Sequence, residues 1–378
     1  MKVVKLGDYI KEYSEKNTGK EKVPVYSVTN EEGFCRGYFS KDVSSRDKSN
    51  YKIVPYGYFA YNPSRINVGS IDWQKAENKV LVSPLYVVFQ VKKGIEQQYL
   101  LHYLKSDIAK SYIKFMANGS VRDNLKFSAL KNFSINLPSV EEQKNIVKKI
   151  DRVDLLYKRL KQLENKYDEL IKSRFVELFG DPIKNPKGWE VVAIGDVVTE
   201  VRYGTSKPAV EGGRYPYLRM NNLTVDGHLD LNDLKYIDIS DDEIEKCVVR
   251  KGDVLFNRTN SVELVGKTAV FDLPEDMVIA GYIIRVRLNE RLLPEVLSEY
   301  MNLEALKAIL RSMAKGAVNQ ANINAQELQS IKVYLPDMEL QLQFLDFFNQ
   351  TDKSKLAVKK SLEKLEILKK SLMQQYFG

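Results

Sequence analysis

The 378-residue chain contains only two cysteines, Cys35 and Cys247, and two histidines, His102 and His228. The cysteines lie far apart with no Cys-x-x-Cys pair, which excludes the usual zinc-site spacing and is typical of a protein of the reducing cytoplasm. The histidines are also isolated in the sequence. We therefore expect structural roles for both of them, and no histidine-ligated metal centre.

Long apolar runs are missing as well. No stretch approaches the roughly 18 consecutive apolar residues of a transmembrane helix, and the start "MKVVKLGDYIKEYSEKN" lacks the apolar segment of a secretion signal. We expect a cytoplasmic protein. Positive charge, in contrast, is in excess, because the net charge is +8 and the isoelectric point is about 9.0. This balance favours an acidic partner such as nucleic acid.

Catalytic motifs are incomplete wherever they begin. The "GKT" at Gly266 ends like a phosphate-binding loop, but that motif needs a glycine where Ser261 stands. Residues 141–144, "EEQK", contain the Glu-x-Lys of many nucleases. The second copy of this segment, aligned at residues 340–343, lacks it, so we interpret the acidic residues as a helix N-terminus. "YNPSR", from Tyr61, only faintly resembles the Asn-Pro-Pro-aromatic loop of amino-methyltransferases. The sequence predicts no catalytic site.

The chain repeats itself with a period too long for a solenoid unit. "VKLGDYI" at Val4 matches "VAIGDVV" at Val192, and "GSVRDNLKFSALKNFSINLP" at Gly119 matches "GAVNQANINAQELQSIKVYLP" at Gly316. "KSRFVELFG" near residue 180 matches the closing "KSLMQQYFG". Each copy combines short β-rich runs, an amphipathic helix and a last strand that a proline ends. We predict an α+β fold with four parts: domains 1–139 and 181–337, the second opening with a linker at 181–190, and long helices 140–180 and 338–378.

Both long helices show heptad repeats of apolar residues. In the first helix, position a is assigned to Ile146, Val153, Leu160 and Tyr167, which are seven residues apart. Position d is assigned to Leu156, Leu163 and Leu170. In the second helix, Val358, Leu365 and Leu372 match position a and Leu368 matches position d. Because both seams arise from one duplication, we expect the helices to pair antiparallel within the chain. A coiled coil between chains, or a helix lying on a domain surface, is the alternative.

Polar and basic residues recur in loops at corresponding places in both copies. Arginine can read guanine, asparagine and glutamine can read adenine, and lysine, serine and threonine suit phosphates. Ordinary solvated loops have a similar composition, but the recurrence favours a DNA-binding role for the loops as a group. The candidate DNA-binding residues are Asn62, Arg65, Asn67, Asn118, Ser120, Arg122, Asn124, Arg202, Arg219, Asn257, Arg258, Thr259, Asn260, Lys267, Lys315, Asn319, Gln320 and Asn322.

Taken together, these motifs resemble the DNA-specificity subunit of type I restriction–modification enzymes. The resemblance rests on "VKLGDYI", "VAIGDVV", "SINLPSVEEQKNIV" and "LFGDPIKNPKGWE", and it covers nearly the whole chain. The second copy departs from the family pattern at "LPDMELQLQFL", and Ser139 replaces a proline in the first. The resemblance implies two target-recognition domains, each reading half of a bipartite site in double-stranded DNA, and two helices that dock methyltransferase subunits, two of them in the expected complex.

The resemblance further implies that this chain is not an enzyme and carries no cofactor. S-adenosylmethionine, ATP and magnesium would belong to the methyltransferase and restriction subunits. About 38 residues at 1.5 Å each give roughly 57 Å per helix, so a rigid pair could set the gap between the half-sites. Two other functions stay open: a coiled-coil assembly protein with protein- or carbohydrate-binding domains, and a methyltransferase–specificity fusion, which the short segment before Val4 disfavours.

Overall fold

The computed structural model describes residues 2–19, 21–37, 47–117, 124–317 and 320–378. It forms two compact units. Unit 1 comprises Met1–Lys161 with Lys360–Gly378, and unit 2 comprises Gln162–Lys359. The predicted α+β fold is confirmed, but each compact unit takes a part of both long helices, so the four-part division of the chain stays a prediction. Within the described residues, no helix combines the length and the apolar character that a membrane span needs.

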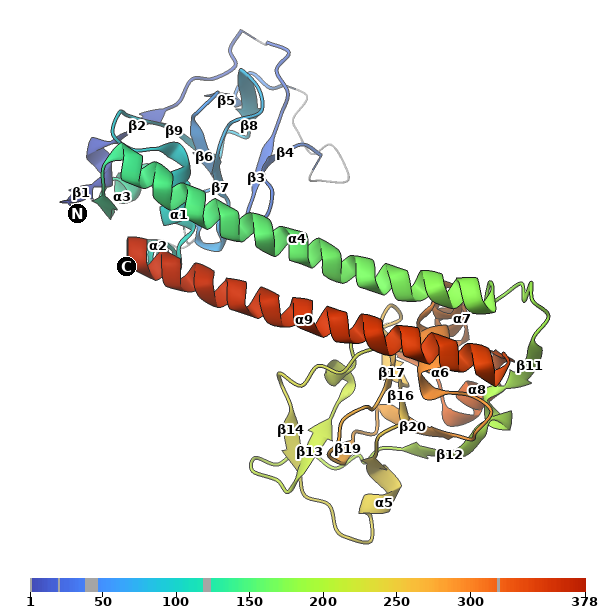
Figure 1. The fold of residues 1–378 in the computed structure, drawn as a ribbon. Coiled ribbons are helices and arrows are strands. Elements are labelled where there is room, and N and C mark those ends of the chain that lie inside the picture. The colour runs from blue at the N-terminus through green and yellow to red at the C-terminus, as the bar shows by residue number, and fades with distance from the viewer. Residues whose placement is uncertain (1, 20, 38–46, 118–123, 318–319) are drawn as a thin grey trace. The chain divides into compact units, whose positions relative to one another are not determined.

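Unit 1 is built around a four-stranded sheet of order β2-β9-β6-β7, which is antiparallel (Figure 1). Its strands are β1 (Lys2–Lys5), β2 (Ile10–Tyr13), β3 (Ser27–Thr29), β4 (Gly33–Cys35), β5 (Lys52–Pro55), β6 (Phe59–Tyr61), β7 (Ile71–Trp73), β8 (Lys79–Val82), β9 (Val87–Val91) and β10 (Ser134–Leu137). Its helical segments are η1 (Leu6–Asp8), η2 (Ile66–Val68), α1 (Gln97–Lys105), α2 (Asp107–Ala117), α3 (Phe127–Leu130) and the first part of α4 (Val140–Phe179).

Unit 2 repeats this plan around the sheet β12-β20-β16-β18. Its strands are β11 (Glu190–Ala193), β12 (Val198–Tyr203), β13 (Tyr215–Leu218), β14 (Lys235–Ile237), β15 (Val248–Val249), β16 (Val254–Asn257), β17 (Thr259–Asn260), β18 (Thr268–Val270), β19 (Met277–Ile279), β20 (Ile283–Leu288), β21 (Lys315–Ala317), β22 (Gln320–Asn322) and β23 (Lys332–Leu335). Its helical segments are η3 (Ile194–Asp196), η4 (Met220–Asn222), α5 (Ile244–Cys247), α6 (Pro294–Asn302), α7 (Glu304–Met313), α8 (Ala325–Ser330) and the first part of α9 (Met338–Phe377).

The central strand of each sheet is buried on both faces. In β6, Phe59 and Tyr61 pack into the core that contains the helices, whereas Ala60 packs with Val28 and Val80 on the opposite face. Side chains alternate along a strand, so a continuous apolar run of this kind serves two cores at once. The equivalent strand β16 does the same, because its residues are also divided between two apolar clusters. This explains why these strands read as unbroken apolar segments.

A buried glutamine fastens the beginning of each long helix to its own unit. The side chain of Gln143 donates to the carbonyls of Gly94 and Pro138 at 2.9 Å and accepts from the Glu96 amide at 2.8 Å. In unit 2, Gln341 makes the same three hydrogen bonds, to the carbonyls of Arg291 and Pro336 and from the amide of Leu293. Both side chains are fully buried, and each clamps the helix start against the loop that leads into α1 or α6.

This pair of glutamines corrects the alignment used for "EEQK". Because Gln143 and Gln341 are structurally equivalent, residues 141–144 correspond to 339–342, one residue earlier than the sequence alignment has it. The interpretation as a helix N-terminus is confirmed. The Ser139 hydroxyl accepts from the Glu142 amide at 3.3 Å and the Glu142 carboxylate accepts from the Ser139 amide at 2.9 Å, the two halves of a capping box. The carboxylate also accepts from the Ser139 hydroxyl at 2.8 Å. These hydrogen bonds lower the pKa of Glu142.

The two long helices, 40 residues each, pack antiparallel, as predicted (Figure 1). In unit 1, Lys369 forms an ion pair with Asp154 at 2.5 Å, and the Tyr157 hydroxyl donates to Glu366 at 2.9 Å. In unit 2, the ring of Phe344 packs edge-on against that of Phe175, with ring centroids 5.4 Å apart.

The predicted assignment of position d is wrong in both helices. Leu156, Leu163 and Leu170 are 41%, 38% and 46% exposed, and Leu368 is 46% exposed. The second buried series is instead displaced by one position. It consists of buried and half-buried residues and runs through Ile150, Tyr157, Glu164 and Ile171 in α4, and through Lys355, Leu362, Lys369 and Tyr376 in α9. The sequence pattern misses this series because several of its members are polar. The leucines that follow the heptad spacing more clearly in the sequence face away from the seam.

We expect the corrected register to appear in stability measurements. Leu362→Ala should lower the free energy of unfolding by about 2–5 kcal/mol, because it removes a buried side chain from the seam. Leu368→Ala, the matched control six residues further on, should change it by no more than about 0.5 kcal/mol. Urea denaturation followed by circular dichroism measures both values. A larger loss for Leu368→Ala than for Leu362→Ala would restore the register read from the sequence.

Candidate nucleic-acid interface

Two polar segments of unit 2 that lie far apart in the sequence form one small sheet. The segment after β16 continues as β17, which pairs with β22 so that Thr259 faces Asn322 and Asn260 faces Ala321. Strand β22 in turn pairs with β21. The amide of Ile323 also donates to the Arg258 carbonyl at 2.9 Å. The structure therefore brings together the two loops that the sequence predicts to act as one surface.

Unit 1 contains the equivalent contact. The amide of Leu125 donates to the Pro63 carbonyl at 3.0 Å, and the Tyr61 hydroxyl donates to the Leu125 carbonyl at 3.1 Å. These bonds place Asn124 beside the loop that follows β6. Arg65 and Asn124 are exposed, and Asn67 is half-buried in η2. The Asn62 side chain accepts from the amide and hydroxyl of Ser64, so it shapes this loop.

Arg258 of unit 2 lies against one exposed tyrosine ring and is joined to a second exposed tyrosine through the backbone. Its guanidinium lies 4.9 Å from the centre of the Tyr203 ring, and its backbone amide donates to the carbonyl of Tyr282 at 2.9 Å. Tyr203 and Tyr282 are 43% and 50% exposed. The guanidinium makes one weak contact, to the Gly281 carbonyl at 3.4 Å. A guanidinium carries five N–H donors. The Nε of Arg258 is buried, so the terminal nitrogens are the groups that a ligand could reach.

The sequence analysis missed these two tyrosines. A weak signal was present, because each stands next to a glycine, in "YG" at 203–204 and "GY" at 281–282. Gly204 lies so close to the next strand that an added Cβ would fall 2.1 Å from the Ile279 carbonyl oxygen. Without knowledge of that backbone approach, however, nothing in the sequence relates Tyr203 to Arg258.

Three predicted contacts in unit 2 prove to be structural groups. Asn257 is fully buried, and its amide donates to the carbonyls of Thr259 and Tyr282 at 3.1 Å. The hydroxyl of Thr259 donates to the Asn322 side chain at 2.9 Å. Lys267 is buried with its ammonium on the carbonyls of Met220 and Leu223, and burial lowers its pKa. These side chains hold the loops in shape, since their polar groups are already used inside the protein.

Asn260 and Asn322 are half-buried, whereas Gln320 is exposed. The Asn260 amide donates to Asn257 at 2.8 Å, and its carbonyl oxygen accepts from Ser261 at 2.9 Å. Asn260 is therefore partly engaged in the loop. The side-chain oxygen of Asn322 accepts from the Thr259 hydroxyl, and the NH₂ group of Asn322 takes no part in that hydrogen bond. Gln320 is the most accessible of these three side chains.

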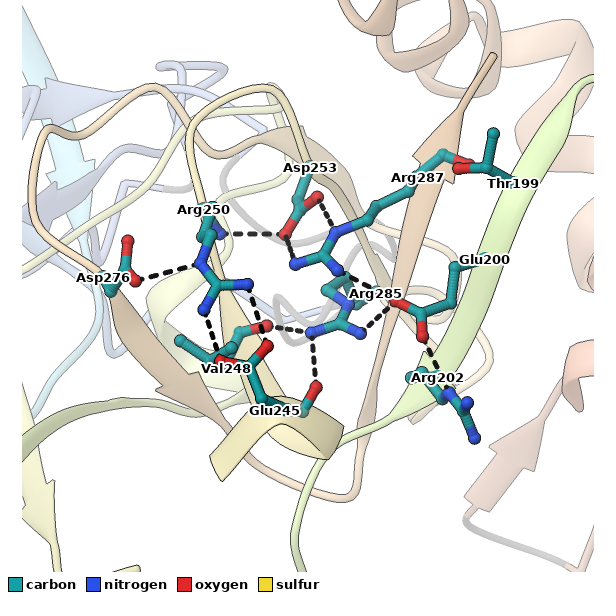
Figure 2. A network of polar contacts seen from close by, with 10 residues as sticks. All are labelled: Thr199, Glu200, Arg202, Glu245, Val248, Arg250, Asp253, Asp276, Arg285 and Arg287. Atoms are coloured by element: carbon teal, nitrogen blue, oxygen red, sulfur yellow. Dashed lines mark hydrogen bonds and ion pairs between the residues drawn. The ribbon is translucent and has the colours of Figure 1, made fainter. Parts of the chain in front are cut away.

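Arg202 and Arg219 do not join the surface around Arg258. Strand β12 places Tyr203 on the face toward Arg258, and side chains alternate along a strand, so Arg202 points to the other face. There it donates to Glu200 at 3.1 Å (Figure 2). Arg219 lies at the end of β13 and forms an ion pair with Asp233 at 2.7 Å. Both arginines are thus held by carboxylates away from the loop sheet.

Figure 2 shows the network of charges that Arg202 joins through Glu200. Arg285 of β20 is fully buried and donates to Glu200, while Arg287 bonds both Glu200 and Asp253. Burial would raise the pKa of the Glu200 carboxyl, but the hydrogen bond from Arg202 and the charges of Arg285 and Arg287 lower it. Removing one partner of a buried ion pair is strongly destabilising, so this network serves to fix β12 and β20.

Several candidates cannot be placed. Asn118, Ser120, Arg122 and Asn319 lie outside the described residues. Lys315 belongs to β21 by its backbone, but its side chain is likewise outside the described part. The described loops of both units nevertheless end next to these segments.

The geometry offers one possible metal-binding group among the described residues. Ligand atoms of Asp168, Asp226 and His228 lie within 4.8 Å of one another. The ammonium of Lys355 contacts all three, at 2.5, 3.0 and 3.0 Å, so these groups are already joined by a cation of the protein itself.

Both cysteines are buried, and burial raises the pKa of each thiol.

Comparison with known proteins agrees with this architecture. The family model described as "Type I restriction modification DNA specificity domain" matches residues 1–166 and 186–368. The chain is 24% identical over 314 residues to the type I restriction enzyme EcoKI specificity subunit of Escherichia coli, covering 77% of this chain and 67% of that relative. It is 31% identical over 153 residues to the type I restriction enzyme MjaIX specificity subunit of Methanocaldococcus jannaschii, covering 35% of each.

Among solved structures, the chain is similar to a type I restriction–modification S subunit from M. genitalium. The two share 14% identity with a TM-score of 0.59, over 100% of this chain and 96% of the other. This similarity concerns the fold alone. The family model, in contrast, matches most of the chain, once in each copy of the duplication. The chain therefore belongs to the family of type I restriction–modification DNA specificity proteins.

Proposed function

We propose that this chain is the subunit that selects the DNA sequence for a type I restriction–modification complex, with each recognition sheet reading one half of a bipartite site. The observation that carries this proposal is the repeated contact between the loop after the central strand and the loop before the last short helix. It is made by Leu125 and Pro63 in unit 1 and by Ile323 and Arg258 in unit 2. Two equivalent polar surfaces in one chain suit a target with two parts.

Within the second surface, Arg258, Gln320 and Asn322 are the proposed base contacts. Arginine can donate two hydrogen bonds to guanine, and an amide side chain can donate to and accept from adenine. The exposed ring of Tyr203 beside Arg258 limits the freedom of the guanidinium. In the first surface, Arg65, Asn67 and Asn124 have the corresponding role. Asn62 and Asn260 support it by shaping their loops.

The long helices are proposed to act as a spacer between the two half-sites. Each has 40 residues, or roughly 60 Å at about 1.5 Å per residue. A rigid helical pair holds a defined spacing, which a flexible linker would not. Support comes from the clamps at Gln143 and Gln341, because a spacer needs firm attachment to the parts that it separates.

We further propose that catalysis lies with partner subunits that dock on the helices. Leu156, Leu163 and Leu170 recur at intervals of seven residues in α4 and remain exposed, so they form an apolar stripe on one face of that helix. Such a stripe suits a protein partner. In this proposal, methyltransferase and restriction subunits supply S-adenosylmethionine, ATP and magnesium chemistry, and this chain supplies the sequence choice.

Replacing Arg258 should relax one half-site only. Loss of a bidentate base contact costs about 1–3 kcal/mol, so Arg258→Ala should admit additional bases at one position of the second half-site. Arg65→Ala is the matched control, since it should affect only the first half-site. Methylome sequencing of cells that carry each variant gives both results. Equal weakening at all sequences would instead assign Arg258 to a phosphate.

Lengthening both helices should widen the gap that is not read. Seven residues inserted after Lys161 and seven after Lys359 add about 10.5 Å of helix, close to the rise of three base pairs. The half-sites themselves should stay the same. Methylome sequencing of the lengthened protein, compared with the parent, measures the gap. An unchanged gap would refute the spacer role while leaving base recognition by the loops intact.

Charges on the leucine stripe should prevent docking without unfolding the chain. Leu156→Lys together with Leu163→Lys should weaken binding of the methyltransferase subunit by more than tenfold, because the stripe would bury two ammonium groups. Leu85→Lys, which changes an exposed leucine outside the helices, should bind normally. Co-elution in size-exclusion chromatography measures the association, and circular dichroism checks the fold. Unaltered binding by the double variant would rule out this surface.

A further inference from the structure

Unit 2 contains an enclosed polar cavity that the proposed DNA-binding role does not use. It lies between α6, the loop at residues 226–229 and the unit 2 segments of α4 and α9, and its volume is about 100 Å³. One water needs about 10–15 Å³ of such volume, so there is room for an ion with several waters. The acidic side chains that line it are Asp168, Asp226, Asp272, Glu295, Glu299 and Asp352.

Two acceptors in this lining have no partner. Glu299 and Asn302 are only 9% and 7% exposed, and neither Oε1 of Glu299 nor Oδ1 of Asn302 receives a hydrogen bond from the described residues. They stand three apart on α6, so they share one face of the helix. The Asn302 amide group donates to the Thr268 carbonyl at 2.7 Å, which fixes the orientation of its oxygen. A buried acceptor left unpaired is destabilising.

The charges around the cavity also lack balance. Burial raises the pKa of Glu299 to about 7, and burial followed by the nearby Asp272 raises that of Glu295. Against these acidic side chains, the lining contains two basic residues, Lys172 and His228. A buried carboxylate with a raised pKa, such as that of Glu299, is a group that a bound cation would stabilise.

Unit 1, the other copy of the duplication, has different side chains at the position equivalent to this cavity. Helices α1 and α6 both have nine residues, so Gln98 and His102 correspond to Glu295 and Glu299. In unit 1, the Trp73 ring nitrogen donates to Gln98 at 3.0 Å, and His102 contacts Asp151 of α4 at 2.7 Å. A ring, an amide and a histidine–aspartate pair thus occupy the junction between sheet and helix.

Unit 2 has replaced every member of that group. Trp73 faces Phe59 across the sheet as Val270 faces Val254, so a small side chain stands where unit 1 has the indole. Glu299 replaces the imidazole, and Asn349, at the position of Asp151 in its long helix, replaces the carboxylate. Val270 and Asn349 both line the cavity. The second copy has therefore opened space, lost a group that can be cationic and gained a carboxylate facing the space.

We propose that the unit 2 cavity binds a hard divalent cation, Mg²⁺ or Ca²⁺, through the carboxylate of Glu299 and the amide oxygen of Asn302, with waters completing the coordination. Such ions take carboxylate and amide oxygens as ligands and tolerate several bound waters. The cation pairs both orphaned acceptors of α6 at once.

The neighbouring group of Asp168, Asp226 and His228 is not this site. The Lys355 ammonium lies among them with its side chain almost fully buried, so that position already holds a positive charge. Burial would raise the pKa of Asp226, but its hydrogen bonds and the charges of Lys355 and His228 lower it strongly. The divalent cation belongs on the α6 side of the cavity, where the acceptors have no donor.

The experiment is a titration of the full chain, freed of metal with a chelator and without DNA, against CaCl₂ and MgCl₂. Calorimetry should show one saturable site, and thermal unfolding should shift to higher temperature on addition of either salt. Glu299→Gln should weaken the binding at least tenfold and abolish the thermal shift. Glu304→Gln, an exposed carboxylate on the next helix, is the matched control and should behave like the parent.

A second variant guards against simple misfolding. Glu299→His combined with Asn349→Asp rebuilds the unit 1 pair, and it should fold normally and show no response to either salt. Absence of a saturable site in the parent, or undiminished binding by the rebuilt variant, would overturn the proposal. So would stabilisation by spermidine but not by the divalent salts, because the ligand would then be an organic amine.

Discussion

The attachment of each long helix to a recognition sheet is the constraint on which the rest of the structure depends. A helix of 40 residues cannot bury its own apolar seam, and an unattached end would leave the sheet free to move. Gln143 and Gln341 solve this with three buried hydrogen bonds each. Amide side chains suit the task, since one group donates twice while the other accepts.

The same units also hold the opposite ends of the helices. Phe377 at the end of α9 packs against Tyr99 in unit 1, with ring centroids 5.1 Å apart, and Phe179 at the end of α4 packs against Phe344 in unit 2 at 5.6 Å. The beginning of one long helix and the end of the other are thus joined in each unit. This is why the "LFG" and "YFG" endings recur in the sequence, and why the compact units do not coincide with the two halves of the chain.

Much of this architecture could be predicted because the duplication makes it visible twice. The strands, the helix lengths and the antiparallel pairing follow from repeated apolar patterns. The seam register could not be predicted, since Tyr157, Glu164 and Lys355 lie inside it while Leu163 lies outside. The loops posed a similar problem. Asn257 and Arg258 are adjacent in the sequence, yet one is fully buried and the other carries free donors, a difference that depends on β17 pairing with a distant strand.

The buried lysine in the seam has a consequence for how such a chain could change over evolutionary time. Sliding α9 by a heptad against α4 and the rest of unit 2 would carry the Lys355 ammonium about 10.5 Å along the helix axis, away from both of its counter-ions, Asp168 and Asp226. Leaving a buried charge unpaired costs about 3–5 kcal/mol. Slippage of one helix along the other is therefore disfavoured, and under the proposed spacer role the spacing would change by insertion or deletion within the helices. The spacing is inherited in discrete steps.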